Sequence, residues 1–365
     1  MIWTRTLLYG ALALHLAACD RTQPREPDSS SGSSASEGTG AVGGSPSAAP
    51  GEPELLYDLT ALGRPVAIHY HDRQLYFGVM TNAAYEFYQA PADGKGAPRK
   101  LGESTAPDAG VLGSVISATS EYVFWVDGVQ LARYDRRAKT STLFSVGIDS
   151  NELDVRIGFL EPNSILAATM NCESISIVNA QSMGHGMVTI NQAVSEQAST
   201  RLLAFGTQIY CATRHSLLAF PTNAGGQGEV EFLQADEAYS FSDLAVFSDQ
   251  LYTVRSALRK NAIVERLDRG ALAHVATLDG AYQSCLVADE QRGVFFLADI
   301  TGWEHPIYKV DVATGTVREL VGSAQPAKRV EADESYLYWT TDNYVVPKEH
   351  LRSGIYRQSK DAPTR

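Results

Sequence analysis

A short pattern recurs through most of this chain: a polar turn is followed by a run of aromatic and aliphatic residues. It is seen in DRQLYFG at 72–78, in SDQLYTV at 248–254 and in DESYLYWT at 333–340. A period near 44 residues has room for four short antiparallel strands and their turns. The spacings between equivalent positions are 48, 42, 44, 42, 44 and 42 residues, taken from Tyr76, Phe124, Leu166, Tyr210, Tyr252, Phe296 and Tyr338.

The two ends of the repeat region indicate a closed ring. The last copy ends at Gly354–Ser359 without a fourth strand, and the region opens at Glu54–Thr60 with a strand that has no repeat before it. Pairing of these two segments completes the last sheet and removes an open edge. Four-stranded sheets repeated radially form a β-propeller. The sequence therefore predicts an all-β fold, a seven-bladed β-propeller over residues 53–365, with six or eight blades as alternatives.

The repeats resemble those of YWTD-like and low-density-lipoprotein-receptor-like propellers. The likeness is carried by YLYWTTDN with GIYRQSK in the last repeat, and by LYFG with FYQAPADG in the first. Only the last repeat carries Tyr-Trp-Thr, and Thr341 follows where the family has Asp. The receptor family also has six blades, against seven repeats counted in this chain. The resemblance implies a propeller fold and transfers no ligand site.

The first 18 residues have the pattern of a secretory signal. Arg5 precedes an almost wholly apolar run, Leu7–Ala18, which is too short to span a membrane. Leu16-Ala17-Ala18-Cys19 resembles the lipobox of bacterial lipoproteins, which implies that Cys19 is lipidated and begins the mature chain. An ordinary secretory signal, cut nearby, is the alternative. Because two or more acyl chains hold a protein stably at a bilayer, we expect a lipid-anchored protein of the bacterial cell envelope, at the inner or the outer membrane.

Residues 19–52 are predicted to be a disordered tether that begins with the lipidated Cys19. Ser, Gly, Pro and Ala make up 22 of the 33 residues at 20–52, a composition that buries too little apolar surface to fold. Without residues 1–18 the formal charge changes from −12 to −13, because Arg5 is the only charged residue lost. Such an acidic chain is not expected to bind nucleic acid. The predicted partners are the membrane, through the anchor, and a protein, peptide or glycan.

The candidate site lies where the first strands of the repeats begin, at the mouth of the central channel of a propeller. Cations gathered at one mouth of an acidic protein favour an anion-binding site, and pairing across blades, for example Arg201 with Asp243, is the alternative. The third repeat offers Arg156 or Ile157 at this position. The other equivalent positions are Ala67, Val115, Arg201, Asp243, Cys285 and Arg329, with Arg64 and Lys328 close by. The candidate ligand-binding residues are Arg64, Arg156, Arg201, Asp243 and Arg329.

Histidines and cysteines leave further alternatives open. His69 and His71 share one strand face, as two zinc ligands do, but no third ligand is identifiable, and solvated turn histidines are the alternative. Of the cysteines after the signal, Cys172 and Cys211 lie in adjacent repeats and are the one pair considered for a disulfide. Three free thiols, with Cys285 as the third, are the alternative.

No common catalytic or nucleotide-binding motif, such as G-x-S-x-G, H-E-x-x-H or a Walker loop, is present. The prediction therefore names no catalytic residue, no metal ligand and no cofactor. By analogy with the fold, the domain is expected to act as a binding or scaffold module. Two alternatives stay open: an extracytoplasmic hydrolase or lyase with its site at the channel mouth, and an envelope-assembly scaffold subunit.

Overall fold

In the computed structural model the chain forms two units, residues 1–43 and 44–365, and the predicted repeats lie in the second. Residues 51–365 are described except for these positions: 83, 105–115, 129, 146–155, 161–163, 169–173, 180, 183–184, 190–198, 214, 222–230, 235–238, 258–260, 281–283, 300–305, 321, 323–326, 328 and 343–351. Within the described residues, no helix is long and apolar enough to cross a membrane. Cys19 and all of the predicted tether except its last two residues, 51 and 52, lie outside the described residues, so the lipid anchor stays a prediction.

The described residues form seven four-stranded antiparallel sheets, numbered here in chain order. Sheet 1 is β2 (Arg64–His71), β3 (Gln74–Met80), β4 (Tyr85–Pro91) and β5 (Arg99–Ser104). Sheet 2 is β6 (Ile116–Ala118), β7 (Tyr122–Asp127), β8 (Gln130–Asp135) and β9 (Thr140–Ser145). Sheet 3 is β10 (Arg156–Leu160), β11 (Ser164–Ala168), β12 (Ser174–Asn179) and β13 (His185–Thr189).

The remaining four sheets follow the same order of strands. Sheet 4 is β14 (Ser199–Phe205), β15 (Gln208–Thr213), β16 (Ser216–Pro221) and β17 (Glu231–Gln234). Sheet 5 is β18 (Ser240–Phe247), β19 (Gln250–Ser256), β20 (Asn261–Asp268) and β21 (Ala271–Asp279). Sheet 6 is β22 (Ser284–Asp289), β23 (Val294–Asp299), β24 (Ile307–Asp311) and β25 (Val317–Glu319). Sheet 7 is β26 (Val330–Ala332), β27 (Tyr336–Thr341), β28 (Gly354–Ser359) and β1 (Glu54–Asp58).

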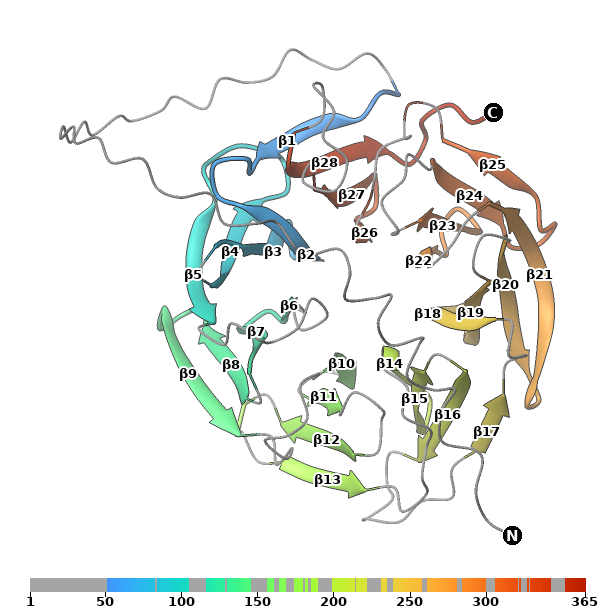
Figure 1. The fold of residues 1–365 in the computed structure, drawn as a ribbon, viewed down its shortest axis with the longest axis horizontal. Helices are drawn as coiled ribbons and strands as arrows, with labels where there is room; N and C mark the ends of the chain where they lie inside the picture. The colour runs from blue at the N-terminus through green and yellow to red at the C-terminus, as the bar shows by residue number, and fades with distance from the viewer. Residues whose placement is uncertain are drawn as a thin grey trace, which may run out of the picture. The chain divides into compact units, whose positions relative to one another are not determined.

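The sheets follow one another around a ring, with each first strand innermost and each fourth strand outermost (Figure 1). First strands of neighbouring sheets contact each other from β10 through β14, β18, β22 and β26 to β2, and on to β6. Sheets 2 and 3 are linked by Arg133, which donates a 3.1 Å hydrogen bond to the carbonyl oxygen of Gln181. This is a β-propeller, as the repeats predict, and each of the seven repeats corresponds to one of these sheets.

Burial within a sheet falls from its inner strands to its outer strand. In β3 the five central residues are all buried, because this strand packs against a neighbouring sheet on each face. In β9, at the outer edge of sheet 2, nearly every residue is exposed. Large rings fill the space between sheets: Phe87 of sheet 1 stacks on Trp125 of sheet 2 with 5.0 Å between ring centroids. The inner strands are therefore a rigid frame for the side chains that they carry.

The ring is closed by antiparallel pairing of β1 with β28, which confirms the predicted closure, with β1 ending at Asp58 instead of Thr60. An ion pair of 2.7 Å between Glu54 and Arg357 joins the two strands. Directly after β1, the fully buried Leu59 donates its N–H to the carbonyl oxygen of Ser353 at 2.8 Å. The backbones approach so closely that a Cβ on Gly354 would lie 2.5 Å from the carbonyl oxygen of Tyr57, so this position requires glycine.

Closure through β1 predicts that a chain starting at Ala61 is much less stable than one starting at Gly51. The shorter chain leaves the edge of β28 unpaired and removes the buried side chains of Tyr57 and Leu59. We expect a decrease of about 4 kcal/mol or more in the free energy of unfolding, measured by urea denaturation and circular dichroism. The Gly51 chain is the control, because it retains all of β1, and equal midpoints would contradict the role of closure.

Candidate functional site at the centre of the ring

Four of the predicted site residues, Arg156, Arg201, Asp243 and Arg329, occupy equivalent positions in the structure, and strand register settles the ambiguity in the third repeat. Arg201 in β14 lies two residues before Leu203, which pairs with Tyr210 of β15. Arg156 in β10 lies two residues before Gly158, which pairs with Leu166 of β11. Arg156, and not Ile157, is therefore at the equivalent position. The side chain of Arg156 lies outside the described part of the chain.

Asp243 binds three of the sheets together. Its carboxylate lies 3.2 Å from Nε of Arg201 in sheet 4 and accepts the backbone N–H of Leu286 in sheet 6 at 2.8 Å. It also accepts the N–H of Leu244, in its own strand, at 2.9 Å. The Asp243 charge raises the pKa of Arg201 above its ordinary value, although burial opposes the shift. The predicted alternative, pairing of Arg201 with Asp243 across blades, is therefore present.

Cys285 and Val330 continue these contacts into sheet 7. The Cys285 thiol donates to the carbonyl oxygen of Val330, with 3.8 Å between sulfur and oxygen. Burial, reinforced by the nearby charge of Asp243, raises the pKa of Cys285 to about 12. The thiol therefore stays protonated at neutral pH and is a hydrogen-bond donor, not a nucleophile.

His69 and Glu331 join sheet 7 to sheet 1. Nδ1 of His69 lies 3.8 Å from Oε1 of Glu331, and both side chains are about one quarter exposed. Burial disfavours the Glu331 carboxylate, but His69, with smaller contributions from Arg329 and Arg201, outweighs it and lowers the pKa of Glu331. The His69 and His71 rings are stacked, with centroids 6.5 Å apart. No three His, Cys, Asp or Glu side chains within the described part form a set that could hold a metal ion.

Two further arginines lie at the same end of the first strands. Arg64, at the start of β2, forms an ion pair of 2.8 Å with the almost fully buried Asp342. Arg329 lies just before β26, and its carbonyl oxygen accepts the N–H of Thr340. Among the residues that the structure describes, the Arg329 guanidinium forms no ion pair within 4.0 Å, although it acts electrostatically on Glu331. Two positions considered earlier, 115 and 328, lie outside the described residues.

These side chains form one central cluster that runs across the inner strands from sheet 4 to sheet 1. The described arginines of the cluster are balanced by three carboxylates, so the site has mixed charge instead of the cationic character predicted. The sequence prediction missed Glu331 and Asp342. Glu331 lies two residues after Arg329, on the same side of its strand, which was the available signal. The central cluster comprises Arg64, His69, Arg201, Asp243, Cys285, Arg329, Glu331 and Asp342.

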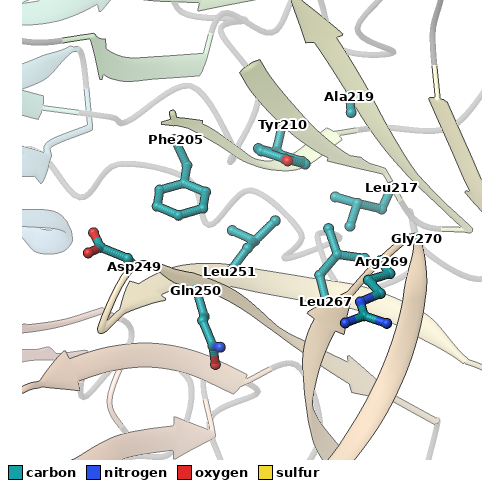
Figure 2. A pocket seen from close by; sticks show the side chains of 10 residues that line it. All are labelled: Phe205, Tyr210, Leu217, Ala219, Asp249, Gln250, Leu251, Leu267, Arg269 and Gly270. Atoms are coloured by element: carbon teal, nitrogen blue, oxygen red, sulfur yellow. The ribbon is translucent and has the colours of Figure 1, made fainter. Parts of the chain in front are cut away.

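A pocket of about 280 Å³ lies between sheets 4 and 5, at the end of the first strands opposite to Arg64 and Arg329. Apolar side chains, among them Phe205, Leu251 and Leu267, form its wall (Figure 2). Figure 2 shows Asp249 and Arg269 on opposite sides of these residues. Both have left-handed backbone φ values, 54° and 49°, as expected for tight turns between strands. The apolar wall belongs to the core between the two sheets.

Cys211 is buried and disulfide-bonded, so the alternative of three free thiols is wrong. Cys285 is free, and the partner of Cys211 therefore lies outside the described residues. Cys172, in the adjacent repeat, remains the predicted partner.

Because Asp243 links three sheets, we expect Asp243→Asn to lower the free energy of unfolding by about 3 kcal/mol. The neutral amide cannot form an ion pair with Arg201, and it cannot accept from both backbone N–H groups without turning its own N–H₂ toward one donor. Asp268→Asn is a matched control, because its pair with Arg266 is exposed at 3.6 Å and should contribute less than about 1 kcal/mol. Urea denaturation measures both, and equal losses would contradict the bridging role.

Comparison with known proteins identifies the fold but does not assign the chain to a family. No family model and no curated protein matches the chain. A catalytically inactive variant of virginiamycin B lyase from Staphylococcus aureus, solved with quinupristin, is 10% identical with a TM-score of 0.63, covering 84% of this chain and 99% of the other. The Cps50 (Swd1) β-propeller domain of Myceliophteria thermophila is 11% identical with a TM-score of 0.58, covering 80% and 96%.

A third similar structure is the extracellular domain of the putative hybrid two-component system BT4673 from B. thetaiotaomicron. It is 13% identical with a TM-score of 0.59, and the match covers 84% of this chain and 39% of the other. At such low identity these likenesses show the β-propeller fold alone.

Proposed function

We propose that this chain is a membrane-anchored extracytoplasmic binding module, whose propeller holds an acidic group of a protein or peptide partner at the central cluster. The observation that carries the proposal is the arrangement of the arginines. Arg64 and Arg201 are each neutralised by a carboxylate, whereas Arg329 faces no described carboxylate at ion-pair distance. Among the described arginines of the central cluster, Arg329 is thus the one whose guanidinium is available to an incoming carboxylate.

The frame around Arg329 supports this role because it is rigid. The neighbouring charges are held by contacts between inner strands, so little side-chain freedom is lost when a partner binds. Arg64 and Arg201 keep about one third of their side-chain surface exposed, which lets a ligand reach them. A guanidinium binds a carboxylate through two parallel hydrogen bonds, which gives the interaction direction as well as charge.

The membrane anchor is part of the same proposal and rests on the sequence. Lipidation at Cys19, followed by residues 20–52, would hold the propeller near an envelope membrane while leaving its faces accessible. A tethered module of this kind needs no catalytic group to act, because it concentrates its partner at the membrane surface.

Pull-down of the full-length chain from detergent-solubilised membranes of its own source tests this proposal. We expect a partner that is retained by the wild-type chain and lost, by about tenfold or more, with Arg329→Glu. Arg318→Glu is the matched control, because it makes the same charge change on the outer strand β25. Equal recovery with both variants would exclude the central cluster as the binding site, and a wild-type chain absent from the membrane fraction would contradict the anchor.

A lyase is the second candidate function, favoured by the pair formed by His69 and Glu331. A histidine beside a carboxylate is able to remove and return protons, as an elimination requires. The pair lies on inner strands of a propeller whose fold is similar to that of a virginiamycin B lyase, and the inactive variant of that lyase has a histidine replaced by alanine.

Incubation of the chain with quinupristin tests the lyase directly, with loss of the intact compound followed by liquid chromatography. If the lyase proposal holds, His69→Ala should slow the loss by about 100-fold or more. His274→Ala is the control, because His274 lies exposed on the fourth strand of sheet 5. Quinupristin that stays intact with the wild-type chain would rule out this substrate.

A further inference from the structure

A second candidate ligand site lies at the seam where the ring closes. A cavity of about 710 Å³ opens between sheets 7 and 1 and is called the seam cavity here. Tyr70 and Arg73, at the end of β2 and in the turn that follows it, line one side, so the cavity lies at the opposite end of the first strands from Arg64. It shares no residue with the central cluster, and its volume lies within the range of small-molecule sites.

Tyrosine rings form the aromatic part of the seam cavity. Tyr70 and Tyr338 are stacked across the seam, with centroids 5.7 Å apart and ring planes within 5° of parallel. The ring centroids of Tyr336 and Tyr338 are 6.4 Å apart, and Tyr336 keeps 36% of its surface exposed. Within the described part of the chain, the exposed large hydrophobic residues are Tyr336 and Leu143. An aromatic ring left open inside a cavity offers an apolar face on which a flat ligand can stack.

Contacts within the cavity wall hold Tyr336 in place. The Asp333 carboxylate accepts the hydroxyl of Tyr338 and the N–H groups of Ser335 and Tyr336, each at 2.7 Å. The Arg357 guanidinium lies 4.9 Å from the centroid of the Tyr336 ring. Arg357 is itself fixed by its ion pair with Glu54. Because the ring is already ordered, binding does not have to restrict it further.

Planar polar groups surround the tyrosines. Asp93, Glu334 and Arg73 are exposed at the rim, and Gln74 is half-buried beside them. Carboxylate, amide and guanidinium groups each present two hydrogen-bonding atoms side by side, which suits the neighbouring hydroxyls of a sugar ring. The apolar face of the same sugar would lie against Tyr336.

The charge balance of the seam cavity selects among ligands. Its lining carries three carboxylates and two guanidiniums, and one guanidinium, Arg357, is already paired with Glu54 outside that lining. This excess of negative charge opposes acidic ligands. Arg357 over Tyr336, and Arg73 at the rim, oppose an ammonium ligand at the same ring. We propose that the seam cavity binds a neutral oligosaccharide, with one sugar ring stacked on Tyr336.

Calorimetric titration of the detergent-solubilised full-length chain tests this site. The probes are cellotetraose, maltotetraose, mannotetraose and the tetramer of N-acetylglucosamine, each up to about 10 mM. We expect at least one to bind with a Kd of about 1 mM or tighter. Tyr336→Ala should weaken that binding by about tenfold, whereas Tyr336→Phe should retain it, because stacking needs the ring and not the hydroxyl.

Leu143→Ala is the matched control, because Leu143 is equally apolar and exposed but lies on β9, away from the cavity. Glu334→Ala is a second test that leaves the tyrosines in place, and it should weaken binding several-fold. Circular dichroism melting establishes that the variants are folded. The proposal is overturned if none of the four sugars binds, if Tyr336→Ala binds as well as Leu143→Ala, or if tetralysine or tetragalacturonate binds more tightly than every neutral sugar.

The central cluster plays no part in sugar binding at the seam cavity. The sugar titration therefore tests the seam cavity independently of the proposed function. Arg329→Glu should leave sugar binding unchanged, because Arg329 lies just before β26, whereas the seam cavity begins beyond its far end. Loss of sugar binding in that variant would contradict a separate site. If sugar binds but the membrane pull-down recovers no partner, the seam cavity is supported and the proposed function is not.

Discussion

The hydrogen-bonded pairing of β1 with β28 is the constraint on which the rest of the structure depends. Three strands of sheet 7 come from the end of the chain and the fourth, β1, comes from its start, so closure of the ring relies on this one strand. The pairing protects the edge of sheet 7 and presses that sheet against sheet 1. The contact of His69 with Glu331 and the whole seam cavity exist only because these two sheets are neighbours.

The central cluster shows how charged side chains on the inner strands link neighbouring sheets, and we propose that it also binds a partner. Removing charges from water is costly unless each is paired, and Asp243 meets that condition with one guanidinium and two backbone donors. The same bonds hold neighbouring sheets at a defined distance. Charged groups carried by packed strands, such as Arg201 and Asp243, are positioned more precisely than groups on loops.

The two ends of the first strands have different chemistry. The end where they begin holds paired arginines and carboxylates, while the end where they finish has tyrosines at the seam and an apolar pocket between sheets 4 and 5. Each end is built from turns and strand ends of adjacent sheets, so neither site belongs to a single repeat. A propeller can thus carry two independent sites on one rigid frame, which is how we interpret this chain.

The sequence by itself determined the repeat, the strand order within each repeat and the closure by residues 54–60, because these depend on local alternation and on a period that is visible along the chain. It also placed Arg201 and Asp243 at equivalent positions and named their pairing as an alternative. Only the tertiary structure decided that Glu331 faces His69, that Asp342 neutralises Arg64, that Cys211 is disulfide-bonded and that Tyr336 stays open in a cavity. Each of these depends on packing between sheets, whose residues are distant in sequence, and neither strand periodicity nor composition specifies which side chains meet across that distance.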